Sequence, residues 1–218
     1  MSTDGNALAA LDKAALLRWM LAFARLVEEN EKLLTDLDAE IGDADHGVNM
    51  RRGVQILRSE LVKIEPLDFA MSFRHLGQAL LGAVGGASGP LYSTFFMQGS
   101  SRLAGLVQAD AASLAAFFVA GVQGVKTRGR ANLGDKTMLD SLHYAAKALH
   151  DAACENRALV DGVQAALEAA EEGKKATIPM IARRGRAAFL KERSAGHQDP
   201  GATSSTFLVQ ALVEACKT

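Results

Sequence analysis

Hydrophobic residues recur along most of the chain at spacings of three and four positions. Between Ala7 and about Leu37, the recurring residues are Leu8, Leu11, Ala15, Leu16, Met20, Ala22, Leu26 and Leu33. This is the period of an amphipathic helix, in which such positions share one face. Similar patterns predict helices over Val48–Val62, Phe69–Leu81, Leu91–Val107, Ala111–Val125, Met138–Ala153, Leu159–Ala170 and Ser204–Ala215. The pattern therefore predicts about eight helices.

The residues between and within these ranges favour an all-α fold. The four prolines fall between the predicted helices, at Pro66, Pro90, Pro179 and Pro200, where they do not interrupt a helix. Ala and Leu, which form helices well, dominate the apolar content, and aromatic residues make up only 6%. No repeat or long linker divides the chain, so we expect a single domain over residues 1–218. Short connections predict an antiparallel eight-helix bundle or closed barrel with its site in loops at one end.

The charge and cysteine content limit the classes of function. Lys and Arg number 24 against 25 Asp and Glu, so there is no electrostatic reason to expect nucleic acid or a membrane as the partner. Cys154 and Cys216 lack a C-x-x-C spacing, which argues against a disulfide framework or a zinc site. The N-terminus has no signal-peptide pattern, and no apolar run is long enough to span a membrane. We expect a cytoplasmic protein.

Three aspartates are concentrated between two predicted helices. Asp38, Asp43 and Asp45 lie within eight residues that also contain Gly42, so a turn can bring their hard oxygen ligands together. Asp43 or Asp45 could instead cap the following helix, with the carboxylates solvated. A calcium-binding EF-hand loop is excluded, because the position that requires a bidentate Glu is Val54. Magnesium shared with phosphate oxygens fits this set better.

Two further segments can bind phosphate. Residues 82–90, GAVGGASGP, have small side chains and precede a helix, so their amides and the Ser88 hydroxyl can approach a phosphate closely. A tight turn between helices explains these glycines equally well, and no G-x-G-x-x-G or Walker A motif is present. Residues 183–203 contain four arginines and a lysine before a turn rich in Gly, Pro and Asp. The guanidinium group of arginine can bind a phosphate through two hydrogen bonds. Most of these side chains, however, are equally well explained as the solvent-exposed face of a helix.

Taken together, the segments resemble the nucleotide-binding L subunits of dihydroxyacetone kinase, a family related to the C-terminal domain of the single-chain, ATP-dependent dihydroxyacetone kinases. The resemblance covers nearly the whole chain and rests on four blocks in order: IGDADHGVNM at 41–50, GGASGPLYSTFF at 85–96, GDKTMLD at 134–140 and GRAAFLKERSAGHQDPGATS at 185–204. The related fatty acid kinases carry Asp-Gly-Asp-Thr-Gly in the first block, so His46 favours the dihydroxyacetone branch. Ser93, Phe189 and Lys191 depart from the family's common Gly, Tyr and Gly.

The resemblance implies a fold and a set of site residues. The fold is an eight-helix antiparallel barrel with the nucleotide at one end. Asp38, Asp43 and Asp45 are the implied ligands of two Mg²⁺ ions that bridge the phosphates of ADP or ATP. Arg186 is the implied catalytic residue. The residues implied around the nucleotide are His46, Asn49, Ala87, Ser88, Gly129, Met138, Arg186, Asp199, Pro200 and Gly201.

The resemblance also implies partners. The acceptor, dihydroxyacetone or a related small ketose, is held by a histidine of a separate K subunit, so this chain is active only together with that subunit. A phosphohistidine-carrying M subunit of the phosphotransferase system recharges bound ADP in free-standing L subunits, whereas the fused relatives exchange ATP. A homodimer is left open. The alternative function is a nucleotide-sensing module that acts mainly through contact with a regulator.

Overall fold

The computed structural model describes residues 8–217. Within that range the chain forms nine α-helices and two 3₁₀ helices, and its β-structure is limited to one isolated bridge between Leu11 and Ala109. The α-helices are α1 (Lys13–Glu29), α2 (Glu31–Ile41), α3 (His46–Glu60), α4 (Phe69–Ala83), α5 (Ser88–Ser100), α6 (Ala111–Gly129), α7 (Leu139–Cys154), α8 (Leu159–Ala176) and α9 (Pro200–Cys216). The 3₁₀ helices are η1 (Leu61–Ile64) and η2 (Arg186–Ser194). The predicted all-α fold is confirmed.

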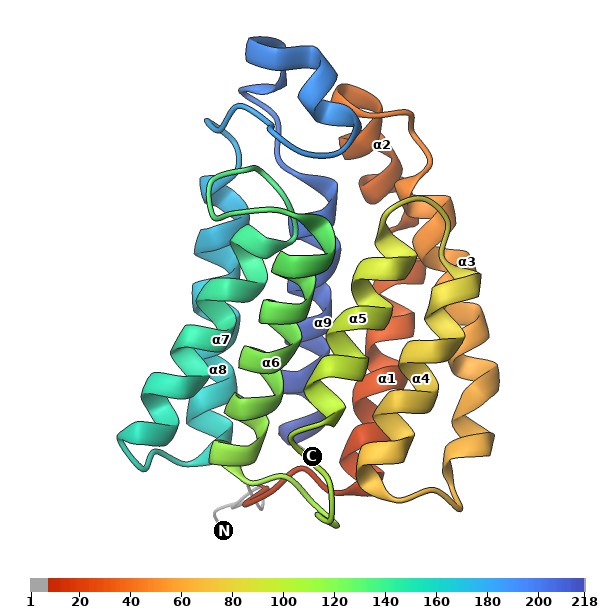
Figure 1. The fold of residues 1–218 in the computed structure, drawn as a ribbon, viewed down its shortest axis with the longest axis vertical. Coiled ribbons are helices and arrows are strands. Elements are labelled where there is room, and N and C mark those ends of the chain that lie inside the picture. The colour runs from red at the N-terminus through yellow and green to blue at the C-terminus, as the bar shows by residue number, and fades with distance from the viewer. Residues whose placement is uncertain (1–7, 218) are drawn as a thin grey trace, which may run out of the picture.

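Eight of these helices close into a ring. Each packs against the next in the order α1, α3, α4, α5, α6, α7, α8 and α9, and α9 packs back against α1. Neighbours in the ring run antiparallel, while α2 and η2 lie together at one end (Figure 1). No helix in the described part of the chain is long and apolar enough to cross a membrane.

Aromatic side chains fill the interior of the ring. Trp19 is fully buried and packs against Phe73, Phe96, Phe117 and Phe118, with ring centroids 5.8 to 6.4 Å apart. Its indole Nε1 donates a hydrogen bond of 2.8 Å to the carbonyl oxygen of Leu208 on α9, which satisfies the polar atom that burial would otherwise leave without a partner. These aromatic side chains therefore form part of the hydrophobic core of the barrel.

Several helix boundaries differ from the sequence prediction, and the two largest changes are a division within the first predicted helix and an early end to the fourth. The first predicted helix is divided at Asn30, whose amide Nδ2 donates to the Leu26 carbonyl oxygen at 2.9 Å. Asn30 has non-helical dihedral angles, φ −112° and ψ 18°, and this break raises the count from eight helices to nine. The helix predicted to reach Val107 ends at Ser100, because Ser100 and Ser101 turn their hydroxyls onto the carbonyls of Met97 and Gln98.

Candidate functional site

Four connections converge at the end of the barrel that carries α2 and η2 (Figure 1). They are residues 42–45, 84–87, 130–138 and 177–199, and they meet there because alternate connections of an antiparallel ring lie at the same end. They surround a cavity of about 570 Å³, a volume in the usual range for a small-molecule site. Every site residue predicted from the sequence lines it: Asp38, Asp43, Asp45, His46, Asn49, Ala87, Ser88, Gly129, Met138, Arg186, Asp199, Pro200 and Gly201.

The three aspartates form a compact carboxylate cluster. One ligand oxygen from each of Asp38, Asp43 and Asp45 lies within 4.8 Å of the others. Buried Asp38 accepts hydrogen bonds from the backbone N–H groups of Asp45 and His46, at 2.9 and 3.2 Å. Asp45 occupies the N-cap position of α3 but makes no side-chain cap bond. The capping interpretation of Asp45 is therefore wrong, and its carboxylate is left available to a cation.

The backbone around the aspartates is fitted closely to them. A Cβ added to Gly42 would lie 2.1 Å from Oδ1 of Asp38, so only glycine allows this approach. Ala44 adopts a φ of 60°, a left-handed conformation that costs a residue with a Cβ about 1 kcal/mol or more. Ala44 lies between Asp43 and Asp45, so its strained conformation occurs in the turn that brings these two side chains beside Asp38. Hard carboxylate oxygens at this spacing fit a Mg²⁺ ion that completes its shell with phosphate and water.

His46 connects the aspartate turn to the glycine-rich turn. Its Nδ1 lies 3.3 Å from the Ser88 hydroxyl, and its Nε2 lies 3.0 Å from the hydroxyl of Ser204, which also accepts a hydrogen bond from Tyr92. Burial lowers the pKa of His46, which favours a neutral imidazole. Such a ring positions Ser88 without adding a positive charge to the cavity.

The glycine-rich turn is held against α3. Gly86 has a φ of +64°, and a Cβ on Gly85 would lie 2.3 Å from Oδ1 of Asn49. That oxygen also accepts a hydrogen bond of 2.8 Å from Arg52. Close packing explains Gly85, and the positive φ explains Gly86. The turn directs the N-terminal end of α5, with Ser88, at the cavity.

Asp199 is a buried carboxyl at the base of the cavity. It is 8% exposed, and it caps α9 by accepting a 2.6 Å hydrogen bond from the Ala202 N–H. Burial raises its pKa to about 7. The same cap places Pro200 and Gly201 on the cavity wall.

Lys136 links two of the four connections. It is 1% exposed, and its ammonium lies 2.5 to 3.4 Å from five carbonyl oxygens, those of Thr177, Ile178, Met180, Ser194 and His197. The ammonium therefore ties residues 177–199, and with them Arg186 and Asp199, to the connection between α6 and α7. Lys136 belongs to the GDKTMLD block that the sequence singles out. Its role could not be predicted, because its five acceptors lie more than 40 residues away in the chain.

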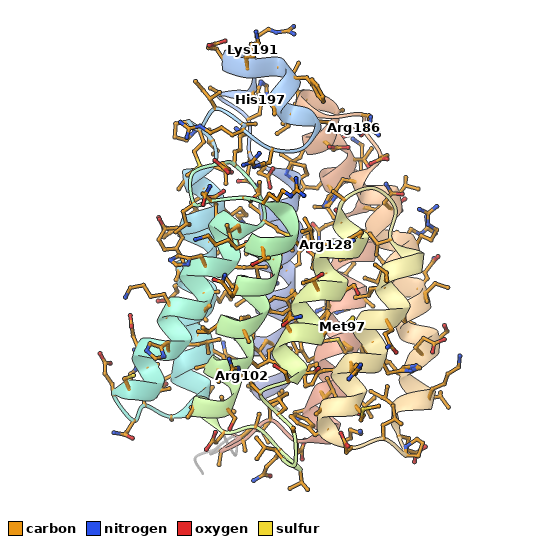
Figure 2. The ribbon with its side chains drawn as sticks, in the orientation of Figure 1. Met97, Arg102, Arg128, Arg186, Lys191 and His197 are labelled. Atoms are coloured by element: carbon orange, nitrogen blue, oxygen red, sulfur yellow. The ribbon has the colours of Figure 1, made fainter. Side chains whose placement is uncertain are left out.

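The structure separates the arginines of the basic segment. Arg186 pairs with Asp43, with Nη2 3.0 Å from Oδ2, and Arg184 lies 3.5 Å from Asp135. Both line the cavity, whereas Arg183 and Arg193 are exposed and do not. Arg128, which sequence reasoning missed, lines the cavity from the end of α6, and Figure 2 shows it below Arg186. The only signal for Arg128 in the sequence is that it directly precedes Gly129, a predicted site residue.

Comparison with known proteins agrees with this geometry. The DAK2 domain model matches residues 40–214. The chain is 39% identical to the ADP-binding subunit DhaL of PEP-dependent dihydroxyacetone kinase from Escherichia coli (strain K12), over 95% of this chain and 99% of that protein. It is 40% identical to the ADP-binding subunit DhaL of PEP-dependent dihydroxyacetone kinase 1 from Listeria innocua, over 93% of this chain and 96% of that protein.

A solved structure shares the fold. The dihydroxyacetone kinase from C. freundii in complex with AMP-PNP and Mg²⁺ superposes with a TM-score of 0.68 at 27% identity. The match covers 98% of this chain but only 36% of that longer chain. The protein is thus an all-helical DAK2 domain. It belongs to the family of DhaL subunits of dihydroxyacetone kinase, which are kinase subunits.

Proposed function

We propose that the chain binds an adenine nucleotide with Mg²⁺ in this cavity and transfers a phosphoryl group to dihydroxyacetone, or a related small ketose, held on a separate K subunit. The observation that carries the proposal is the convergence of three carboxylates within 4.8 Å of one another at the mouth of a cavity of about 570 Å³. Three like charges this close are stabilised by a cation. The relatives named as ADP-binding subunits support the choice of ligand.

The proposed metal ligands are Asp38, Asp43 and Asp45, which would hold two Mg²⁺ ions against the nucleotide phosphates. Bound Mg²⁺ neutralises phosphate charge during transfer. Asp38 is oriented by two backbone N–H groups, so its carboxylate is fixed before any ligand arrives. The chain itself therefore positions the cluster, which is the main requirement for electrostatic catalysis.

Different walls of the cavity suit different parts of the nucleotide. Ser88, at the start of α5, presents a hydroxyl and a helix N-terminus to phosphate. Arg186 supplies a guanidinium beside the carboxylate cluster and is the proposed catalytic residue. Met138, Leu91 and Val125 give an apolar wall for a base. No covalent intermediate on this chain is required, because phosphoryl transfer depends mainly on positioning and charge.

The proposed partners follow from the relatives. DhaL of Lactococcus lactis is a subunit of a PTS-dependent dihydroxyacetone kinase. We propose that the phosphohistidine-carrying M subunit of the phosphotransferase system recharges ADP on this chain, and that activity requires the K subunit. The chain covers almost the full length of these DhaL relatives, which supports the proposal that residues 1–218 form one nucleotide-binding domain.

The test combines binding with turnover. Calorimetry should show ADP binding that depends on Mg²⁺, and the purified chain should phosphorylate dihydroxyacetone only when a K subunit and a recharging partner are added. Binding without any transfer in the complete mixture would instead favour a nucleotide-sensing module that acts through a regulator. Absence of ADP binding in the presence of Mg²⁺ would contradict both functions.

A further inference from the structure

Helix α6 presents an unusual surface to solvent. It contains no charged residue between Ala111 and Val125. Nevertheless Ala112, Ala116 and Gln123 are exposed, and Val119 is 47% exposed. The solvent face of a helix in a water-soluble barrel normally carries charged side chains. An uncharged exposed face of this length indicates a surface that another molecule covers.

This face forms the floor of a groove of about 1190 Å³ between α5, α6 and α7. Ala112, Ala116 and Ala120 follow one another at four-residue spacing along it, so another helix can approach the backbone of α6 closely. Helix α6 has 19 residues, which corresponds to a length of about 28 Å. The groove therefore has the shape and length to take a helix of four to five turns.

The rim of the groove is positively charged. Arg102, Arg128 and Lys147 line it, with His143 and His150, and no Asp or Glu does. Lys147 pairs with Asp151 at 2.5 Å, while Arg102 and Arg128 make no ion pair within the described part of the chain. Figure 2 shows Arg102 toward one end of α6 and Arg128 toward the other. The two unpaired cations thus mark the two ends of an uncharged floor.

We propose that this groove binds an acidic amphipathic helix of a partner protein. The apolar stripe of that helix would lie on Ala112, Ala116 and Val119, and its carboxylates would pair with Arg102 and Arg128. Docking of an amphipathic helix into an apolar groove is a common mode of recognition, and opposite charges at the rim fix its position. Arg128 also lines the cavity with the aspartates, so the partner would end beside that site.

A second copy of this chain fits the groove less well. A two-fold interface places the same surface on both subunits, so these cationic rims would face each other. No carboxylate among the lining residues would compensate that repulsion. The charge of the rim therefore selects an acidic partner over self-association.

The probe is a fluorescein-labelled helical peptide of 18 residues with an Ala/Leu stripe and glutamates beside the stripe and at both ends. A second peptide carries lysine in place of every glutamate. Fluorescence anisotropy with the full-length chain should show saturable binding of the glutamate peptide, weakened by added salt. Ala116→Glu and Arg102→Glu should each weaken binding at least about tenfold.

Two controls match these substitutions outside the groove. Ala169→Glu on α8 and Arg74→Glu on α4 introduce the same side chain at positions that do not line the groove, and they should leave peptide binding unchanged. Circular dichroism of each variant establishes that it is folded. Nucleotide binding, measured on the same samples, should be unaffected by Ala116→Glu, so a failure of the groove proposal is distinct from a failure of the proposed function.

Several results would overturn the proposal. The proposal is wrong if the glutamate peptide does not saturate the protein below about 1 mM. It is also wrong if the lysine peptide binds equally well, or if Ala116→Glu binds the glutamate peptide as tightly as the wild type does. Sedimentation that shows a dimer dissociated by Ala116→Glu would assign the groove to a second copy. Binding to phosphatidylglycerol vesicles that Ala116→Glu abolishes would assign it to a lipid surface.

Discussion

The guanidinium of Arg186 pairs with Asp43, with Nη2 3.0 Å from Oδ2. The side chains of this pair are 67% and 35% exposed, so the ion pair is worth at most about 1 kcal/mol. Asp43 is also a proposed metal ligand. A cation bound by Asp43 can therefore displace Arg186 at little cost and leave its guanidinium free to reach the phosphates. Arg186 and the proposed cation would therefore compete for the carboxylate of Asp43.

This relationship predicts that Arg186→Ala slows phosphoryl transfer more than it weakens nucleotide binding. The arginine interacts most strongly as charge spreads over the phosphoryl oxygens, whereas in the ground state its loss also removes its competition for Asp43. We expect kcat to fall at least about a hundredfold and ADP affinity in Mg²⁺ to change less than about tenfold. The assay is phosphorylation of dihydroxyacetone with the K subunit and a recharging partner.

Arg183 and Arg193 are the matched controls for Arg186. Both belong to the same basic segment, are exposed and do not line the cavity. Their replacement by alanine should change the rate little. Normal turnover of Arg186→Ala would remove it from catalysis, and equal losses in all three variants would indicate a disrupted partner surface.

Asp43→Asn should weaken ADP binding in Mg²⁺ by at least about an order of magnitude, because the proposed bridging cation loses a charged ligand. With EDTA present the sign should reverse, since the variant has one less negative charge facing the phosphates. Isothermal titration calorimetry under both conditions measures the two effects. Asp36→Asn on α2, at a residue that does not line the cavity, serves as control. Equal affinities of wild type and Asp43→Asn in Mg²⁺ would exclude Asp43 as a ligand.

The sequence predicted the helices well because their apolar positions are periodic and their ends carry ordinary signals. Asp12, Asp68, Asp110 and Asp199 each accept a hydrogen bond from a backbone N–H as the N-cap of α1, α4, α6 or α9. The break at Asn30 was missed because the apolar spacing continues across it. What divides the helix is the non-helical backbone conformation of this one residue, and the spacing of apolar positions does not reveal it.

The sequence predicted some parts of the site and missed others. The aspartates are close in the chain, so their convergence could be expected, whereas the use of Asp38 to cap α3 depends on the turn between them. Lys136 and Arg128 act through contacts with distant segments, which spacing alone does not reveal. Lys191 illustrates a departure with a physical cost: it has a φ of 51°, at a position where the resemblance gives glycine as common, and glycine adopts that conformation without strain.

Lys136→Met should destabilise the protein and loosen residues 177–199. The substitution keeps most of the side-chain volume but removes the donor from five carbonyl oxygens. Buried acceptors without a partner cost about 1 to 3 kcal/mol each when water cannot replace the donor, so we expect a loss of at least about 2 kcal/mol. Urea denaturation measures it. Hydrogen exchange should become faster in residues 177–199, and ADP affinity should fall because this segment carries Arg184, Arg186 and Asp199.

Lys126→Met on α6 is the control for Lys136→Met, because Lys126 is exposed. It should leave stability and hydrogen exchange close to the wild-type values. If Lys136→Met unfolded at the wild-type urea concentration, the five-carbonyl contact would not be what holds the segment.

Asp199→Asn should make the protein without nucleotide and Mg²⁺ more stable at neutral pH. Burial raises the pKa of Asp199 from 3.8 to about 7, so the folded state holds a proton that the unfolded state releases. The free energy of unfolding of the wild type therefore falls as the pH rises from about 4 to about 7 through this group. Asparagine still offers an oxygen to the Ala202 N–H and has no proton to lose.

The measurement is the difference in unfolding free energy between Asp199→Asn and wild type, from urea denaturation between pH 4.5 and 8. Because one pH unit between folded and unfolded pKa values corresponds to about 1.4 kcal/mol, the difference should grow by about 2 to 4 kcal/mol up to pH 7 and then stay constant.

The lowered pKa of His46 makes the stability of both proteins rise with pH. This contribution cancels when the unfolding free energy of wild type is subtracted from that of Asp199→Asn. Asp110 has a pKa lowered by its hydrogen bonds to Ser113, so it is ionised in both states throughout this pH range, and the difference between Asp110→Asn and wild type should not change with pH. A difference for Asp199→Asn that does not change with pH would mean that Asp199 is already ionised in the folded protein at acidic pH.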